Sequence, residues 1–411
     1  MTLMTKISCL LIGICFAFRL HSPIAFGICI GISLILIIVE NRKNITLWFK
    51  KSKLKPIFPF VFVSFVSFFL SSSFSIMPIR SFPVIIYFYS FLLFSFIIYN
   101  FLKDNKNAVR ITSIFFLLST FFCVLLVFFY NILNYESIYL YHQDGIEFAP
   151  YEIKKYKGFV NLLTILVFLC PYIEKILGHQ RLIISVFVII LIFPVIILTN
   201  CKAALLGLAG GTIILLILKF FDKNIFYKKK IIISLTLISI FLGLSVFNVL
   251  EKQLNMVVNL NEEFKISQTI IDAHRQIIWG FSYKEFKKNW FLGTGPDTSN
   301  FVENSQIEIG HPLTGDMTYI PSHPHNFLIE LLLETGFFGL ISFFILIFYT
   351  NLLFVKKSDA LDLKFLLFFN GYFWTSSLVN FSFWAAWWQG SYFIIIAILF
   401  SIISNKNLSL K

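Results

Sequence analysis

The apolar residues of this chain are gathered into runs long enough to cross a lipid bilayer, and this feature limits the fold most. A membrane-spanning helix needs about 20 mainly apolar residues, with a range of roughly 17–25. The sequence predicts an all-α polytopic membrane protein with about 12 transmembrane helices. The expected spans are 7–20, 23–39, 57–75, 82–99, 111–130, 159–173, 182–199, 203–220, 231–249, 336–354, 365–383 and 386–403.

The composition leads to the same class of protein. Of the 411 residues, 58% are hydrophobic and 13% are charged, whereas a soluble domain carries about 25% charged residues. Soluble globular enzymes, disordered chains and coiled coils are therefore excluded. The 6 cysteines lie within apolar runs or at the end of one, without a CxxC pair. We interpret them as packing residues rather than metal ligands or redox groups.

The net charge of +13 has two possible explanations, a nucleic-acid-binding surface or loops sorted by side of the membrane. If the N-terminus is inside and the spans alternate, 22 of the 34 Lys and Arg residues fall in inside segments. Of the other 12, six lie in the long segment 250–325, whose charges count little for topology. The distribution predicts cytoplasmic termini at both ends, and no nucleic-acid partner.

Two of the polar segments between spans are long, 131–158 and 250–325. The second contains Trp279 and Trp290 and shows helical periodicity over 270–290, so we expect a folded cap on the outer face. The expected divisions are 1–249, with nine membrane helices, 250–335, with the cap and a short helix, and 336–411, with three membrane helices and a cytoplasmic tail.

A polar pattern follows the cap directly. Asn326, Glu330 and Glu334 are spaced four apart, which places them on one face of a helix. Gly336 suits the end of that helix, and Gly339 permits close packing as the next span begins. The pattern has two interpretations. One is a capping asparagine beside an interfacial histidine, and the other is an anion site at the start of a helix.

Basic residues on the same side of the membrane could face such an anion. Arg275 lies in the helical part of the cap, Lys202 between two spans, and Arg80 in a short outer turn. Lys202 or Arg80, taken alone, is equally explained by a side chain that extends to the interface. For Lys284 a solvated helix face is the simpler explanation.

The sequence predicts neither a metal site nor a cofactor. His311, His323 and His325 lack the i, i+4 spacing of a zinc enzyme, and no flanking carboxylate completes a motif. Nucleophile elbows (GxSxG), Walker loops and dinucleotide fingerprints are absent from the sequence.

The string His325-Asn326, nine residues, Gly336, two residues, Gly339 resembles the signature of the bacterial O-antigen ligase family. That family has about a dozen spans and a large periplasmic loop before the signature. The loop carries an Arg-x3-Trp element, which matches Arg275 to Trp279 here, followed by a Leu-Gly-x-Gly-Pro turn. The turn corresponds to 292–296 in this chain.

One position departs from the family pattern. The family usually has Ser-Arg where this chain has Cys201-Lys202. Lysine keeps the positive charge but loses the paired N–H donors with which an arginine binds a phosphate in a bidentate manner.

The resemblance implies an inverting, metal-independent glycosyltransferase of the bacterial inner membrane, with its active site on the periplasmic face. Its donor would be an undecaprenyl-diphosphate-linked O-antigen glycan, and its acceptor a sugar hydroxyl of the lipid A core in lipopolysaccharide biosynthesis. His325 would act as general base, with His323 in reserve. Arg275 and Lys202 would bind the diphosphate, with Arg80 as a weaker third. The residues expected to support them are His323, Asn326, Trp279, Glu330, Gly336 and Gly339.

Two other functions fit the sequence less well. An O-antigen polymerase would perform the same chemistry on a second lipid-linked repeat unit. A polytopic lipid or glycan transporter would carry charged residues in the middle of its spans. Here the charges lie at the outer boundary and in one loop, which favours an enzyme.

Overall fold

The computed structural model describes residues 1–51, 54–133, 157–178, 181–220, 225–258, 264–311, 313, 314, 316–355, 358–379 and 381–409. Within these ranges the regular structure is helical, apart from an isolated bridge between Glu308 and Thr318. Most of the long segment 131–158 lies outside the described residues. The α-helices are α1 (Leu3–His21), α2 (Pro23–Lys51), α3 (Phe58–Ser73), α4 (Pro78–Lys103), α5 (Lys106–Leu133), α6 (Lys157–Ile176), α7 (Ile183–Leu198), α8 (Lys202–Phe220), α9 (Ile225–Val258), α10 (Ala273–Lys288), α11 (Phe327–Val355), α12 (Ala360–Ser376) and α13 (Ala386–Ser409).

The prediction of an all-α polytopic membrane protein is confirmed. In the described part of the chain, 10 helices are long and apolar enough to cross a membrane. They coincide with ten of the expected spans. The expected spans 182–199 and 365–383 correspond to shorter helices, α7 with 16 residues and α12 with 17. The number of spans therefore stays a prediction.

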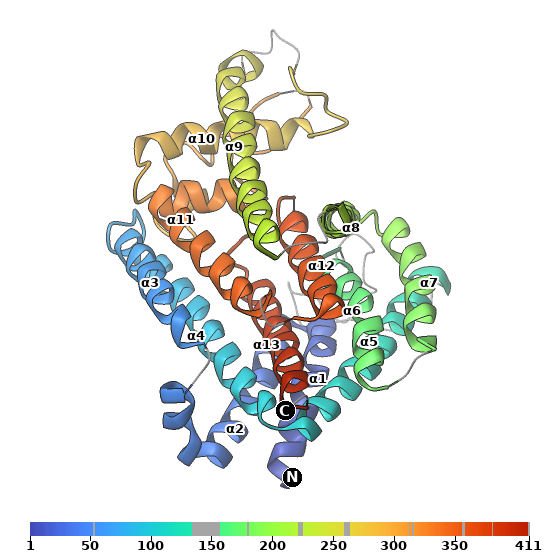
Figure 1. Cartoon of the computed structure of the whole chain (residues 1–411). Coiled ribbons are helices and arrows are strands. Elements are labelled where there is room, and N and C mark those ends of the chain that lie inside the picture. Colours follow the sequence, from blue (N-terminus) through green and yellow to red (C-terminus); the bar gives the residue numbers. More distant parts are fainter. Residues whose placement is uncertain are drawn as a thin grey trace.

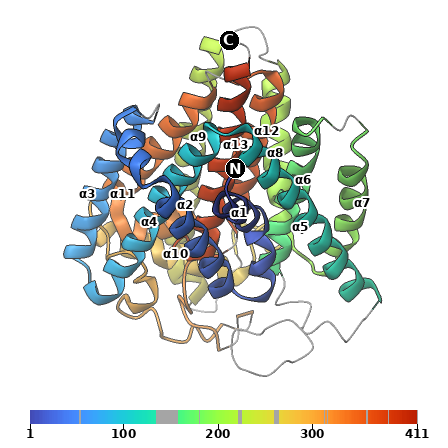
Figure 2. The same cartoon turned by 90° about the horizontal axis from the view of Figure 1, so that it is seen from below.

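The two termini lie at one end of the bundle, and α10 lies across the other end (Figure 1). We call the described part of the loop before α11 the cap, and the end of the bundle that carries it the cap end. Viewed from the opposite end, α3 and α11 lie on one side of the bundle and α5, α6 and α7 on the other (Figure 2). This common location of both termini is what an even number of crossings requires.

Small residues and a polar cluster hold the membrane helices together. Helix α8 runs antiparallel to α12, and the Cα atoms of Gly207 and Gly211 lie against the rings of Tyr372 and Phe368. A Cβ atom at Gly211 would stand 2.7 Å from the Phe368 ring. Helices in a bilayer pack by such close approach, because burying apolar surface does not favour helix association where the lipid tails are equally apolar. Polar side chains join α11, α12 and α13 through the hydrogen-bonded set Asn351, Asn370 and Tyr392.

The predicted end of the span 365–383 is wrong. Helix α12 ends at Ser376, and a non-helical segment leads to α13 at Ala386. Backbone groups of this segment bond to the start of α11: the Ser377 carbonyl accepts from Phe327 N–H, at 3.2 Å, and Phe383 N–H donates to Glu330, at 2.7 Å. Non-helical backbone is tolerated at membrane depth only where protein satisfies it. Hydropathy alone could not reveal these distant partners.

Candidate functional site

Asn326 caps α11. Its Oδ1 atom accepts hydrogen bonds from the N–H groups of Leu328, at 3.0 Å, and Ile329, at 3.3 Å. An asparagine oxygen in this position satisfies N–H groups that have no partner inside the helix. The interpretation of Asn326 as a capping residue is therefore confirmed, and its side chain is committed to the backbone.

His323 and His325, which precede the helix-capping Asn326, are held in a tight bend. His325 has φ 55°, which few non-glycine residues adopt. Its N–H donates to Nδ1 of His323, at 3.1 Å, and the two rings lie 4.1 Å apart. The carbonyl of Pro324, between them, accepts from Nε1 of Trp279 on α10, at 2.8 Å. Trp279 thereby fixes residues 323–325, here called the histidine segment, against α10.

His323 remains neutral at working pH. Burial, assisted by the neighbouring His325, lowers the pKa of His323 to about 3. Its Nδ1 atom is already occupied as the acceptor of the His325 N–H group. A histidine with these properties is a poor general base near pH 7. Of the two histidines, His325 is therefore the better candidate for that role.

Arg275 lies one helical turn before Trp279, on the same face of α10. Its Nη1 atom pairs with Asp272, the capping residue of α10, at 2.7 Å. Its Nε atom is buried and has no hydrogen-bond partner among the described residues. A buried donor without a partner is costly. The structure thus places Arg275 one helical turn from Trp279, which contacts the histidine segment, and leaves one guanidinium donor unused.

Helix α11 is broken at Gly336, which has φ 64° and ψ −171°. The turn 292–296 docks into this break. Thr294 N–H donates to the Leu333 carbonyl, at 3.0 Å, and Gly295 N–H to the Glu334 carbonyl, at 2.8 Å. A Cβ atom at Gly336 would stand 2.2 Å from the Phe291 carbonyl oxygen, and one at Gly293 would stand 2.4 Å from the Glu334 carbonyl carbon. Only glycine fits at either position.

The carboxylate of Glu334 is enclosed by donors. It accepts from the backbone N–H groups of Asp297, Thr298 and Ser299, at 2.7, 3.1 and 2.9 Å. The Ser299 hydroxyl and Nε1 of Trp384 also donate to it. Successive backbone N–H groups of this kind form an anion-binding nest. Trp384 and residues 297–299 were not identified from the sequence, although the Gly-Pro-Asp turn was a signal for the latter.

Glu330 lies one turn earlier on the same face, as the spacing predicted. Its two oxygens accept from the Ser382 hydroxyl, at 2.5 Å, and from Phe383 N–H, at 2.7 Å. It is fully buried. Both carboxylates of this helix therefore hold loops in place, and neither is presented to a substrate.

Arg80 has a protein partner at some distance from the histidines. Its Nε atom donates to the side chain and to the backbone carbonyl of Asp297, both at 2.9 Å. Its guanidinium also lies 5.0 Å from the ring of Phe301. Asp297 adjoins Glu334, which follows His325 by nine residues, or about 13 Å along the helix. The structure therefore separates Arg80 from the histidines.

Lys202 is the first residue of α8 and is exposed. The sulfhydryl of its neighbour Cys201 donates to the Lys157 carbonyl, at 3.3 Å, which joins the starts of α6 and α8. Because α8 and α12 are antiparallel, Lys202 lies at the end of the pair that carries Ser377. The Ser377 carbonyl in turn bonds to α11. Lys202 is thus at the cap end.

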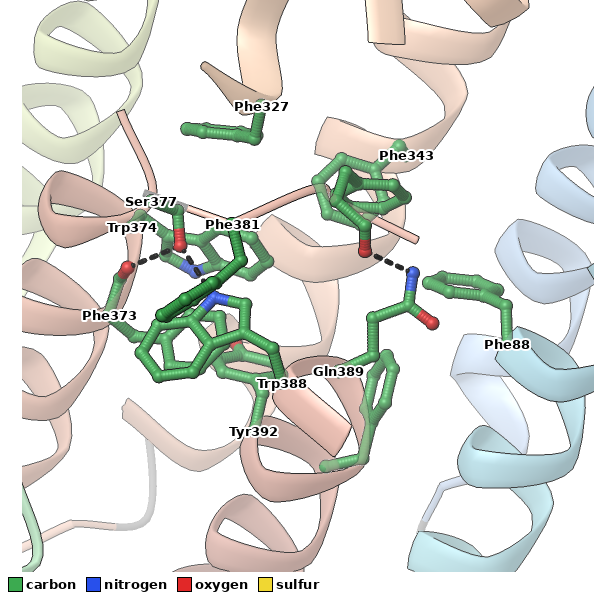
Figure 3. Close-up of a pocket in the computed structure, with 12 residues that line it drawn as sticks. Phe88, Phe327, Phe343, Phe373, Trp374, Ser377, Phe381, Trp388, Gln389 and Tyr392 are labelled. Carbon is green, nitrogen blue, oxygen red and sulfur yellow. Dashed lines mark hydrogen bonds between the residues drawn. The ribbon is translucent and has the colours of Figure 1, made fainter. Parts of the chain in front are cut away.

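An aromatic cavity lies behind the first turn of α11 (Figure 3). None of the described residues that line it is charged, and Nε1 of Trp374 is buried without a partner among them, whereas two other polar side chains are engaged with neighbours. Trp388 Nε1 donates to the Ser377 hydroxyl, at 2.9 Å, and Gln389 donates to the Phe383 carbonyl, at 2.6 Å. Its walls offer no acid or base. The lining residues are Phe88, Phe327, Phe343, Phe373, Trp374, Ser377, Phe381, Phe383, Trp388, Gln389, Tyr392 and Phe393.

Gly339 and His311 complete the candidates. A Cβ atom at Gly339 would stand 2.1 Å from the Thr335 hydroxyl oxygen of the same helix and 3.4 Å from the Phe68 ring of α3. His311 packs edge-on against Phe264 at 5.5 Å and accepts from Leu313 N–H. In the part of the chain that the structure describes, no group of three or more His, Cys, Asp or Glu residues is placed to hold a metal ion.

Comparison with known proteins identifies relatives of this region. Residues 185–344 match the family model described as O-antigen ligase. A Rickettsia conorii protein named "Putative polysaccharide ligase" is 28% identical over 215 residues, which cover 49% of this chain and 47% of that protein. A Rickettsia prowazekii protein with the same descriptive name is 29% identical over 200 residues, or 46% and 45% of the two chains. The chain spans about half the length of the curated relatives it matches.

The pKa of His323 leads to a pH prediction. Because the pKa of His323 is lowered in the folded state, protonation of this group favours the unfolded state. The stability that neutral His323 contributes to the folded protein is complete above the unfolded pKa of about 6.5 and is lost as pH falls below it. Between pH 7 and pH 5 this one group should reduce the free energy of unfolding by about 2 kcal/mol.

His323→Asn keeps an acceptor for His325 N–H but cannot be protonated. Thermal unfolding of the purified protein in detergent, followed from pH 7 to pH 5, should therefore show a smaller decline for His323→Asn than for wild type. Equal declines would mean that His323 is not held neutral.

Proposed function

We propose that the protein is a membrane glycosyltransferase, because residues 185–344 match the family model described as O-antigen ligase. It transfers a glycan from undecaprenyl diphosphate to a sugar hydroxyl of the lipid A core, with inversion at the anomeric carbon. The observation that carries the proposal is the position of His325, at the start of a capped helix and against the helix that bears Arg275. The matched region contains His325, Arg275 and Lys202.

In the proposed mechanism His325 removes the proton from the acceptor hydroxyl as that oxygen attacks the anomeric carbon. A positioned base of this kind contributes typically 10²–10⁴-fold to the rate. The bond from the anomeric carbon to the diphosphate oxygen breaks, and the diphosphate departs with the electron pair. His323 is not the base in this proposal, because its low pKa and its bond to His325 N–H disqualify it.

Negative charge develops on the departing diphosphate, and fixed cations lower the energy of that state. Arg275 is proposed for this role because its unused Nε donor points to a missing acceptor. Lys202 is the second candidate, as a point charge at the start of α8. Arg80 is set aside because Asp297 engages it.

An O-antigen polymerase is the alternative, since it would use the same residues with another lipid-linked repeat unit as acceptor. We rank it second because the family description and the relatives' names are those of ligases. A transporter is ranked last. The buried carboxylates of α11 are tied to loops and do not line a pathway.

We expect His325→Ala to reduce transfer by 10²–10⁴-fold, because the variant lacks the base. The measurement is a lipopolysaccharide gel from cells in which the variant replaces the native gene, with protein levels checked by immunoblot. For a ligase the gel shows bare core, and for a polymerase it shows core with a single repeat unit.

The matched control is His274→Ala, which removes another cap histidine whose ring contacts the Thr318 carbonyl. It should leave the ladder intact. A full ladder from His325→Ala at normal protein level would exclude His325 as the base.

The proposal also requires both termini in the cytoplasm and the cap in the periplasm, as the distribution of Lys and Arg predicts. A green fluorescent protein fused after residue 409 should fluoresce, and alkaline phosphatase fused after residue 310 should be active. The two reporters exchanged between these positions should both be silent. The reverse pattern would place the cap in the cytoplasm and remove the proposed substrates from reach.

A further inference from the structure

Exposed apolar side chains gather where the cap meets the turn between α3 and α4. Phe74 and Ile76 in that turn and Ile79 in the first turn of α4 are 71%, 51% and 83% exposed. Just after α10, Trp290 and Phe291 are 58% and 49% exposed. A tryptophan and four other large apolar side chains at the surface need a partner, because contiguous patches of this kind mark interaction sites.

The two groups of side chains belong to one surface. The N–H of Ile76 donates to the carbonyl of Thr294, at 2.9 Å, which joins the turn to the cap. The carbonyl of Trp290 accepts from Phe337 N–H, at 2.8 Å. The Phe291 ring stacks on Phe338 of α11 with an angle of 3° between the planes. Trp290 and Phe291 are therefore held beside the lipid-crossing part of α11.

This surface lies between an apolar and a charged region. On one side it continues into exposed residues of the membrane helices, including Phe69 of α3 and Ile86 of α4. On the other side is the last part of α10, where Lys284, Lys287 and Lys288 are exposed. A boundary between apolar and charged surface is the level at which tryptophan is enriched in membrane proteins.

We propose that Phe74, Ile76, Ile79, Trp290 and Phe291, here called the anchor patch, insert into the interfacial layer of the lipid leaflet on the cap side. The occupant is lipid rather than a second protein, because the patch is continuous with the lipid-facing surface of α3 and α4. The amphipathic indole of Trp290 suits this layer, where one end of the ring is apolar and the other wet.

The anchor patch gives α10 a fixed height above the bilayer. One end of α10 leads directly into Trp290, and the middle packs on α9, where Gly280 lies against the Leu250 carbonyl. Arg275 lies near the other end of α10, about 20 Å from Lys288 along the axis. Helix α10 lies across the cap end of the bundle (Figure 1). Anchored in this way, it lies along the membrane surface and keeps Arg275 at the level of the lipid head groups.

The test is fluorescence quenching of the whole chain in nanodiscs. The chain has 7 tryptophans, so emission of wild type minus that of Trp290→Phe gives the contribution of Trp290. Phosphatidylcholine brominated near the head-group end of its acyl chains should remove about half of this contribution or more, as expected for an interfacial ring. Bromine near the methyl end should remove less, and iodide in the buffer should remove little.

Trp279→Phe is the matched control, since Trp279 is buried and bonded to the Pro324 carbonyl. The contribution of Trp279 should resist both brominated lipids. Quenching of Trp290 by iodide but not by lipid would place the patch in water. Resistance of Trp290 to every quencher would mean that protein covers it, and either result would overturn the proposal. Neither result depends on glycosyl transfer, which the His325 variants test separately.

Discussion

The structure of the cap end depends on the hydrogen bonds that enclose the carboxylate of Glu334. Three backbone N–H groups from the turn 297–299 and the indole of Trp384 donate to it. It therefore joins the cap, α11 and the start of α13 at one point. A buried N–H donor that loses its acceptor costs about 1–3 kcal/mol.

Gly336 makes that junction possible. The break in α11 releases backbone carbonyls at 333 and 334, which an unbroken helix would have used internally. The turn 292–296 occupies them, and its glycine at 293 allows the two backbones to touch. The short helix before the break is thus fixed at its far end by Glu334 and at its near end by Asn326. His325 stands immediately before that helix, so both clamps determine where its ring can lie.

Most of the candidate residues are engaged by other protein groups, and this explains which residues remain for chemistry. Glu330 and Glu334 are committed to loops, Asn326 to a helix cap, and Arg80 to Asp297. Among the candidate cations and bases, Arg275 retains a buried donor without a partner in the described residues. The proposed reaction therefore rests on few groups, held by neighbours that do not take part in it.

Local features were predictable from the sequence, and long-range pairings were not. The positions of ten apolar helices, the α10 helix, the Asn326–Glu334 face and the break at Gly336 depend on short stretches of chain, and the structure has them. The pairing of Arg80 with Asp297 joins residues 217 apart, and hydropathy carries no information about it. The end of α12 was misjudged for the same reason, since its loop is stabilised by α11. Apolar lining residues of a cavity look like any other core residues in a sequence.

Amide hydrogen exchange is the most direct measurement of the central claim, that Glu334 fixes the cap to the helix that presents His325. In Glu334→Gln an NH2 group replaces one acceptor oxygen, so a buried N–H donor is left without its acceptor, at a cost of about 1–3 kcal/mol. The amides of 297–299 should exchange about tenfold faster or more, and those of 323–329 should also lose protection. Glu303→Gln, at an exposed position in the cap, should match wild type. Unchanged exchange at 297–299 in Glu334→Gln would contradict the account.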